Sequence, residues 1–239
     1  MEVLFELEPV SSRAKLLGRV RELVDLVDWI DVPDSPMGRS RFPSPIVSCV
    51  IKNLFEDTRV IAHLRVIDVS RVALEATLRG LELCNVERVT FVRGDVIEGS
   101  SVVRDVEPEE AVRIARSSTK VKPGLTLSLR KSLEEIEGRL RVGAEFYLVL
   151  NLNKDSLEKM EATSRVARKL NIKLYPYVVL ITDANRDRIL GVMERWKLHD
   201  FNEALELVEA SNDVADGILV SSPMDFKGGL ELVRRLRRR

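Results

Sequence analysis

The sequence contains no glutamine, only two histidines and two cysteines, and only 5% aromatic residues. It also lacks an excess of charge of either sign, because Lys and Arg together number 38 and Asp and Glu together number 38. A chain with zero net charge has no overall field that would attract nucleic acid or an anionic membrane surface. We therefore expect neither of these as a partner.

Long apolar runs and targeting signals are missing as well. No stretch is long enough to span a bilayer, and the first residues have neither the basic region nor the apolar core of a secretory signal. Cys49 and Cys84 lie within helical patterns at a spacing that matches no metal or redox motif. These absences predict a cytoplasmic protein with reduced thiols and no metal site. The lack of glutamine, with abundant Arg, Glu and Val, suggests a thermophile.

The main positive feature is a regular alternation of two kinds of segment along the 239 residues. Short apolar runs rich in β-branched residues alternate with segments whose apolar residues recur at helical spacing. The predicted strands are 3–7, 29–32, 59–67, 87–92, 125–129, 145–150, 173–181 and 216–221. The predicted helices are 11–27, 45–55, 70–84, 108–117, 132–142, 155–170, 185–196 with a second piece at 202–210, and 225–237.

Strict alternation of strands and helices implies parallel strands joined by right-handed crossovers. Eight such units, with no shift of composition that would mark a linker, predict one α/β domain over residues 1–239, a (β/α)8 TIM barrel. A doubly wound open sheet is the alternative. No Gly-x-Gly-x-x-Gly follows any predicted strand, which disfavours a dinucleotide-binding Rossmann unit.

Candidate functional residues lie at the carboxyl ends of the predicted strands, where barrel enzymes carry their chemistry. The strand 87–92 stops abruptly at Arg93-Gly94-Asp95. Gly94 allows a tight bend or a close approach to a ligand, although Gly-Asp after a strand is also a common turn. Other polar residues in or just after predicted strands are Glu6, Glu8, Asp31, Asp34, His63, Asn151, Tyr177 and Ser221.

Glu6 and Glu8 are two residues apart, so they point to the same face of the first strand as Leu4. A carboxylate inside a barrel is costly unless it is paired or takes part in chemistry. We expect burial to raise the pKa of Glu6 unless a cation such as Arg65 or Arg93 reaches it. A raised pKa suits a general acid near neutral pH, whereas a buried ion pair is the structural alternative.

Several segments, in order, resemble the methylenetetrahydrofolate reductase family, in particular its short reductase-like branch. The spacing agrees over most of the chain. The segments are Phe5-Glu6-Leu7-Glu8-Pro9, Asp34-Ser35-Pro36-Met37-Gly38-Arg39-Ser40-Arg41, Ala62-His63-Leu64, Val92-Arg93-Gly94-Asp95 and Gly143-Ala144.

This resemblance implies a (β/α)8 barrel that binds FAD and reduces a methylene-pterin, a folate or modified folate, to its methyl form. NADH or another donor would supply the electrons. The resemblance makes Glu6 the general acid and Asp95 a carboxylate that tunes the flavin from its pyrimidine edge. The residues matched to cofactor contacts are His63, Val92, Arg93, Gly94, Asp95 and Arg139. Arg139 matches a basic residue near the cofactor phosphates.

The sequence departs from the family at two places around the folate. Leu150 stands where the family has a glutamine that holds the pterin, and Ser128-Leu129-Arg130-Lys131 replaces a Tyr-Pro region. Besides the folate-type substrate, an electron-donor protein or a second copy of the chain is a possible partner. Two other functions stay open: a catalytically reduced subunit that binds a pterin or a partner protein, and an unrelated barrel enzyme with an acid or base at Glu6 or Asp95.

Overall fold

The computed structural model describes residues 1–239 except 9, 97–98, 100, 192, 194–195 and 239. The proline of the first family-like segment and part of the predicted helix 185–196 are therefore outside the described residues.

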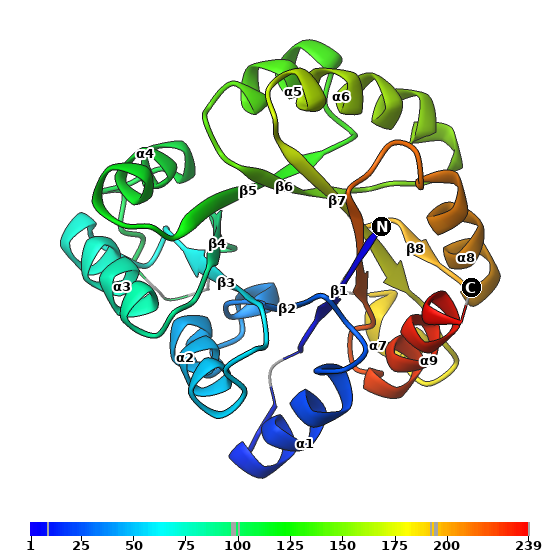
Figure 1. Cartoon of the computed structure of the whole chain (residues 1–239), viewed down its shortest axis with the longest axis horizontal. Helices are drawn as coiled ribbons and strands as arrows, with labels where there is room; N and C mark the ends of the chain where they lie inside the picture. The colour runs from blue at the N-terminus through cyan, green and yellow to red at the C-terminus, as the bar shows by residue number, and fades with distance from the viewer. Residues whose placement is uncertain (9, 97–98, 100, 192, 194–195, 239) are drawn as a thin grey trace.

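Eight parallel strands form a closed ring at the centre of the molecule (Figure 1). Neighbours in the chain pair in sequence from β1 to β7, and β9 closes the ring by pairing with both β7 and β1. The strands of the ring are β1 (Glu2–Glu6), β2 (Trp29–Val32), β3 (Val60–Arg65), β4 (Arg88–Val92), β5 (Lys122–Ser128), β6 (Phe146–Leu150), β7 (Lys173–Leu180) and β9 (Gly217–Ser221).

Helices cover the outside of the ring, so the predicted (β/α)8 fold class is confirmed. They are α1 (Arg13–Leu23), α2 (Ser44–Leu54), α3 (Arg71–Leu83), α4 (Pro108–Ser118), α5 (Leu133–Leu140), α6 (Leu157–Lys169), α8 (Phe201–Ala210) and α9 (Phe226–Arg237). Ser12, Ser70 and Ser132 cap three of them by accepting a backbone N–H in the first turn. None of the helices in the described ranges is both long and apolar enough to cross a membrane.

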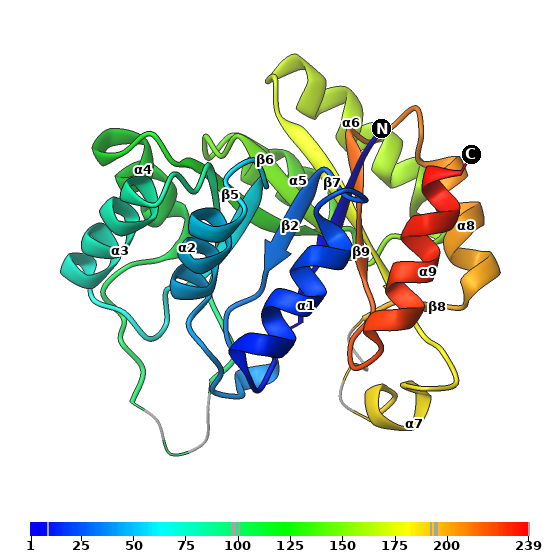
Figure 2. The same ribbon diagram turned by 60° about the horizontal axis from the view of Figure 1, so that its bottom comes forward.

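The connection from β7 to α8 differs from the prediction. The predicted helix 185–196 is wrong, because α7 covers only Arg186–Ile189 and is followed by a turn. Met193 and Trp196 instead pack against side chains of the barrel interior, and this burial outweighs their helical spacing. A two-residue strand, β8 (Leu198–His199), then pairs with the end of β7 outside the ring. Figure 2 shows α7 at one end of the barrel.

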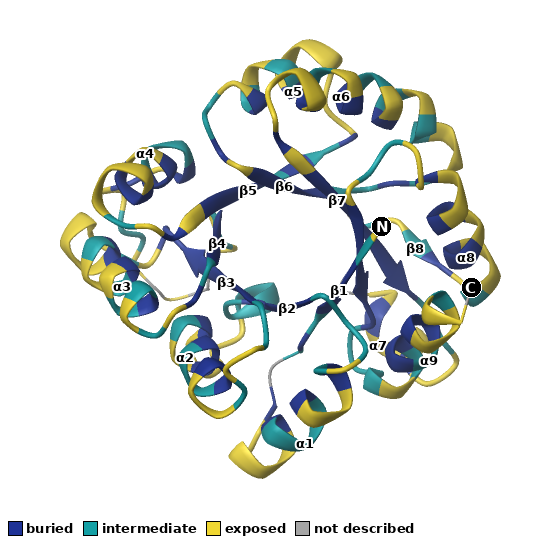
Figure 3. Ribbon diagram, in the orientation of Figure 1, coloured by how far each residue is buried: buried dark blue, intermediate teal, exposed yellow. Residues whose placement is uncertain are grey.

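Side chains alternate between the barrel interior and the helix layer, as β1 illustrates. Leu4 joins the apolar cluster inside the ring, whereas Phe5 and Leu7 pack with the helices, so the face that Leu4 shares with Glu6 is the interior one. Figure 3 shows that the strands are buried and that the exposed residues lie mainly on the outward faces of the helices. The same alternation aims Glu6 at the interior.

The two cysteines form a disulfide, so the expectation of reduced thiols is wrong. Cys49 on α2 and Cys84 at the end of α3 lie 35 residues apart in sequence, with their Cα atoms 5.2 Å apart. Packing of α2 beside α3 creates this separation, which is normal for a disulfide. The disulfide removes the basis for predicting a reducing compartment. It is compatible with a location inside or outside the cell, because disulfides also occur in the intracellular proteins of hyperthermophiles.

Candidate active site at the carboxyl end of the barrel

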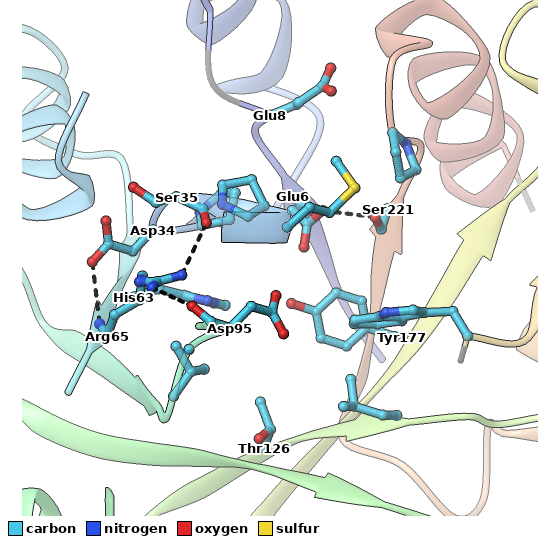
Figure 4. Close-up of a pocket in the computed structure, with 18 of the residues that line it drawn as sticks. Glu6, Glu8, Asp34, Ser35, His63, Arg65, Asp95, Thr126, Tyr177 and Ser221 are labelled. Carbon is cyan, nitrogen blue, oxygen red and sulfur yellow. Dashed lines mark hydrogen bonds between the residues drawn. The ribbon is translucent and has the colours of Figure 1, made fainter. Parts of the chain in front are cut away.

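A cavity of about 390 Å³ opens at the carboxyl ends of the strands (Figure 4). This volume lies within the range of small-molecule sites. The lining residues come from most strands of the ring and from the loops that follow them: Glu6, Glu8, Pro33, Asp34, Ser35, Pro36, Met37, His63, Arg65, Val92, Arg93, Gly94, Asp95, Thr126, Leu150, Tyr177, Met193, Trp196, Ser221 and Pro223. We call this cavity the mouth.

The structure brings nearly all of the sequence-predicted site residues together. Glu6 and His63 line the mouth, and so does the whole segment from Val92 to Asp95. Figure 4 shows the side chains of Glu6, Asp95 and Tyr177 directed toward the middle of the mouth from three different parts of the chain. Closure of the ring thus unites residues that are up to about two hundred positions apart in sequence.

Arg139 is the exception, because its side chain is engaged in other contacts. It lies on α5, in the helix layer, and does not line the mouth. Its guanidinium forms an ion pair with Glu109 of α4 and donates from Nε to the backbone carbonyl of Thr126 at 2.7 Å. Arg139 therefore ties two helices to the outside of β5.

Glu6 has the environment of a proton donor. Its carboxyl oxygen Oε1 accepts a hydrogen bond of 2.8 Å from Ser221 Oγ, and the Tyr177 hydroxyl also bonds to the carboxyl group. Burial raises the pKa of Glu6 to about 7, and the nearby Asp31 carboxylate adds to the increase. The hydrogen bonds and the charge of His63 only partly oppose this rise. Near neutral pH, a large share of Glu6 is therefore protonated, as the sequence led us to expect.

His63 is held by a carboxylate that does not line the mouth. Its Nε2 lies 2.9 Å from Oδ1 of Asp31, which is fully buried beneath the mouth. Burial alone would lower the pKa of His63, but the charges of Asp31, Glu6 and Asp34 outweigh it and raise the pKa above its ordinary value. The imidazole is therefore biased toward its charged form.

Arg65 serves as a clamp on the loops around the mouth rather than as a free cation. Its guanidinium donates to the backbone carbonyls of Asp95 at 2.8 Å and Ser35 at 3.4 Å, and to the Asp68 carboxylate at 2.5 Å. Gly94 has a φ of +91°, and a Cβ at this position would lie 3.0 Å from the Arg65 Cζ atom. Gly94 is thus required by backbone conformation and by the close approach of Arg65.

Left-handed backbone conformations at non-glycine residues recur in the loops around the mouth. Ser35 and Met37 have φ values of 42° and 58°, and Met224, after β9, has 62°. Asn151, directly after β6, has a φ of 65°. Such conformations are costly for non-glycine residues and concentrate where a protein shapes a binding site.

Sequence reasoning did not assign a role to several residues that the mouth depends on. The sequence identifies Asp31, Tyr177 and Ser221 only as polar residues near strand ends, and it places Trp196 in a predicted helix. The signal available for Asp31 was its place on the interior face of β2, since Ile30 and Val32 on either side pack with the helices. A fully buried acid between two apolar neighbours is itself unusual.

Comparisons with known proteins identify the fold and nothing more specific. No protein-family model and no curated protein matches the chain. Among solved structures, the chain is similar to a mutant tryptophan synthase alpha-subunit from the hyperthermophile Pyrococcus furiosus, with a TM-score of 0.64 and 11% identity. The match covers 99% of this chain and 96% of that one. At this level of identity, the likeness supports a TIM barrel and carries no information about activity.

Proposed function

We propose that this protein is a flavin-dependent reductase that converts a methylene-pterin, a folate or modified folate, into its methyl form. The observation that carries the proposal is Glu6, a carboxyl group whose pKa of about 7 fits a general acid, in a cavity shared with Asp95 and His63. The family-like segments of the sequence support the same reaction, because four of them contribute residues to this mouth.

The residues of the mouth fit the ring system of a flavin. Tyr177, Trp196, Met37 and Met193 offer apolar and aromatic surfaces against which flat rings pack. Asp95 and the backbone at Gly94 would meet the polar edge of the rings. When bound, the flavin would supply the reducing electrons.

The mouth offers fewer groups that could hold the diphosphate of FAD than groups that could pack against its rings. Arg139 is engaged in the helix layer, so the cation at the rim is Arg93. The Arg93 side chain is 65% exposed and lies 4.0 Å from Glu107, an ion pair that contributes little at the surface. Arg93 could therefore turn to a phosphate at small cost.

Glu6 would donate its proton to the ring nitrogen of the substrate that leaves as the five-membered ring opens. Tyr177 and Ser221 hold the carboxyl group in place through their hydrogen bonds. Asp95 offers acceptor oxygens to N–H groups of a bound heterocycle. Leu150 lines the mouth where the family carries a glutamine, so the pterin would be held by contacts other than that amide.

The first test is the absorption spectrum and mass of whatever copurifies with the protein, followed by titration with FAD. A flavin spectrum is expected. The second test is Glu6→Gln, which keeps the shape and removes the proton donor. Reduction of the methylene-pterin should fall about 10²–10⁴-fold while dithionite still reduces the flavin. Glu8→Gln, at the rim, is the matched control and should keep both half-reactions. Unchanged pterin reduction in Glu6→Gln would contradict the proposal.

Leu150 in the mouth favours a second candidate, an acid–base enzyme of another reaction class. Glu6, Asp31 and His63 can move protons without a cofactor. A protein that binds no flavin, yet loses turnover of a screened substrate in Glu6→Gln, would support this candidate.

A further inference from the structure

Glu6 and Asp31 are neighbours across two paired strands. In the parallel pairing of β1 with β2, the Cα atom of Glu6 lies opposite that of Asp31. Both side chains point into the barrel, because Phe5 and Ile30 on the same strands pack with the helices. The two carboxyl groups therefore lie on adjacent strands of the barrel interior, Glu6 at the mouth and Asp31 buried below it.

Asp31 leaves one oxygen without a partner. Its Oδ1 lies 2.9 Å from His63 Nε2, whereas Oδ2 is buried and has no hydrogen-bond partner among the described residues. The residue is fully buried, and an orphaned carboxylate oxygen in such a place is costly. The Glu6 carboxyl on the adjacent strand is close enough for the charge of Asp31 to affect its protonation.

The groups around this pair come from β3, β7, β9 and the loop after β2. His63 on β3 contacts Asp31, and Asp34 after β2 acts on His63. Tyr177 on β7 and Ser221 on β9 bond to Glu6. His63 is thus the one titratable cation acting directly on the pair among the described side chains, since Arg65 directs its guanidinium to Asp68 and to backbone carbonyls.

We propose that Glu6 and Asp31 form a carboxyl pair that shares one proton, with Asp31 as the positioning residue that keeps this proton available at the mouth. One proton between two adjacent carboxyl groups relieves the repulsion that two charges would create. His63 neutralises the charge that remains on Asp31. The pair then releases its proton to a ligand through Glu6, the member that is reachable from the mouth.

This inference rests on geometry and needs neither flavin nor folate, so it can fail or stand independently of the proposed function. The experiment is a pH titration of the ligand-free protein labelled with ¹³C at the side-chain carboxyl groups of Glu and Asp, followed by NMR. The Glu6 resonance is assigned by its loss in Glu6→Gln. In the wild type, the titration of Glu6 should also move the Asp31 resonance, because a shared proton changes the surroundings of both carboxyl groups.

Asp31→Asn removes the charge and keeps the shape, so it should lower the pH at which Glu6 titrates by about 1 unit or more. Asp34→Asn is the matched control: it removes an acid of the same mouth that acts on His63, and the Glu6 titration should change much less. Ser221→Ala removes a hydrogen bond that favours the charged form, so it should shift Glu6 in the opposite direction to Asp31→Asn.

Two results would overturn the proposal. One is a Glu6 titration that is the same in Asp31→Asn and in the wild type. The other is a wild-type Asp31 resonance, assigned by triple-resonance methods, that does not respond where Glu6 titrates. The second measurement decides the question even if Asp31→Asn fails to fold.

Discussion

Glu2 and Glu6 lie on the same strand and point to the same face, yet the pKa of Glu2 is lowered at one end of the barrel and the pKa of Glu6 is raised at the other. At the amino end, Glu2 accepts hydrogen bonds from Tyr175, Trp29 and Lys173. Burial alone would raise the pKa of Glu2, but these donors lower it to about 2. At the carboxyl end, burial raises the pKa of Glu6 to about 7. The surroundings at the amino end thus favour the charged form of Glu2, whereas those at the carboxyl end favour the neutral form of Glu6.

The amino end also packs its cations on aromatic rings. The Arg88 guanidinium lies 3.8 Å from the ring centre of Trp29 and 5.1 Å from that of Phe146, and it donates to the Tyr175 hydroxyl at 3.0 Å. Such contacts add stability when they are shielded from water. The comparison indicates that the amino end is built for stability, whereas the mouth keeps charges and strained backbone for binding and chemistry.

The largest effect on stability is expected outside both ends, from the disulfide. Replacing Cys49 and Cys84 by serine should lower the free energy of unfolding by about 4 kcal/mol, because the disulfide closes a loop of 35 residues in the unfolded chain. Denaturant unfolding with and without reductant measures this. The mouth should keep its ligand affinity, and a loss of affinity would show that α2 and α3 also control the site.

Glu2→Gln should remove the main anionic anchor of the amino end. The folded pKa of Glu2 is depressed to about 2, so its stabilisation is present above the unfolded pKa and is lost as pH falls from about 4.5 to 2. Because Glu2 is only half-buried, solvent screens part of this effect, and we expect a loss of about 2 kcal/mol at pH 7 and little difference below pH 2. Urea titrations across this range would reveal it. Equal loss at every pH would mean that packing, and not charge, explains the effect.

Glu6→Gln should do the opposite. The folded pKa of Glu6 is raised to about 7, so the wild type has its full stability below the unfolded pKa of about 4.5 and loses stability as pH rises through 7. The variant should therefore match the wild type near pH 4.5 and be more stable by about 2 to 3 kcal/mol above pH 8. Unfolding of both proteins at two pH values is sufficient, and a less stable variant at high pH would be evidence of a buried ion pair.

Arg139→Ala should have the smallest effect. It removes a surface ion pair with Glu109 and one hydrogen bond to Thr126, so stability should fall by about 1 kcal/mol. Flavin or other ligand affinity at the mouth should not change, whereas Arg93→Ala should weaken an anionic ligand. Isothermal titration of both variants compares them. A selective loss of affinity in Arg139→Ala would restore the role that the sequence suggested.

The sequence patterns predicted the barrel because its strands and most of its helices have strong periodicity that agrees with their burial. Alternation along β1 places Leu4 and Glu6 on one face and Phe5 on the other, and the structure shows that the Leu4 face is the interior. The helix predicted over 185–196 is wrong because Met193 and Trp196 pack against the barrel interior rather than along one face of a helix. Helical spacing of apolar residues alone cannot distinguish these two arrangements.

The unpredicted parts of the site depend on contacts between distant segments. The pairing of Asp31 with His63 requires the register of β2 and β3, and the disulfide requires the packing of α2 on α3. The role of Arg139 is implied only by resemblance to a family, which places a residue along the chain but not its side chain in space. The sequence predicts a tight bend or a close approach to a ligand at Gly94, and the structure shows in addition that the absence of a side chain leaves room for the Arg65 guanidinium.

The hydrogen bond from Ser221 to Glu6 joins residues 215 positions apart, so the site has an unusually high contact order. β9 pairs with β1 on one side and with β7 on the other, so both of these strand edges stay unpaired until β9 has been made. A nascent chain that ends before β9 would present open strand edges and an incompletely enclosed Glu6. The raised pKa of Glu6 is therefore established only after the whole barrel has been translated. In chains that end before β9, the pKa of Glu6 should lie closer to its ordinary value.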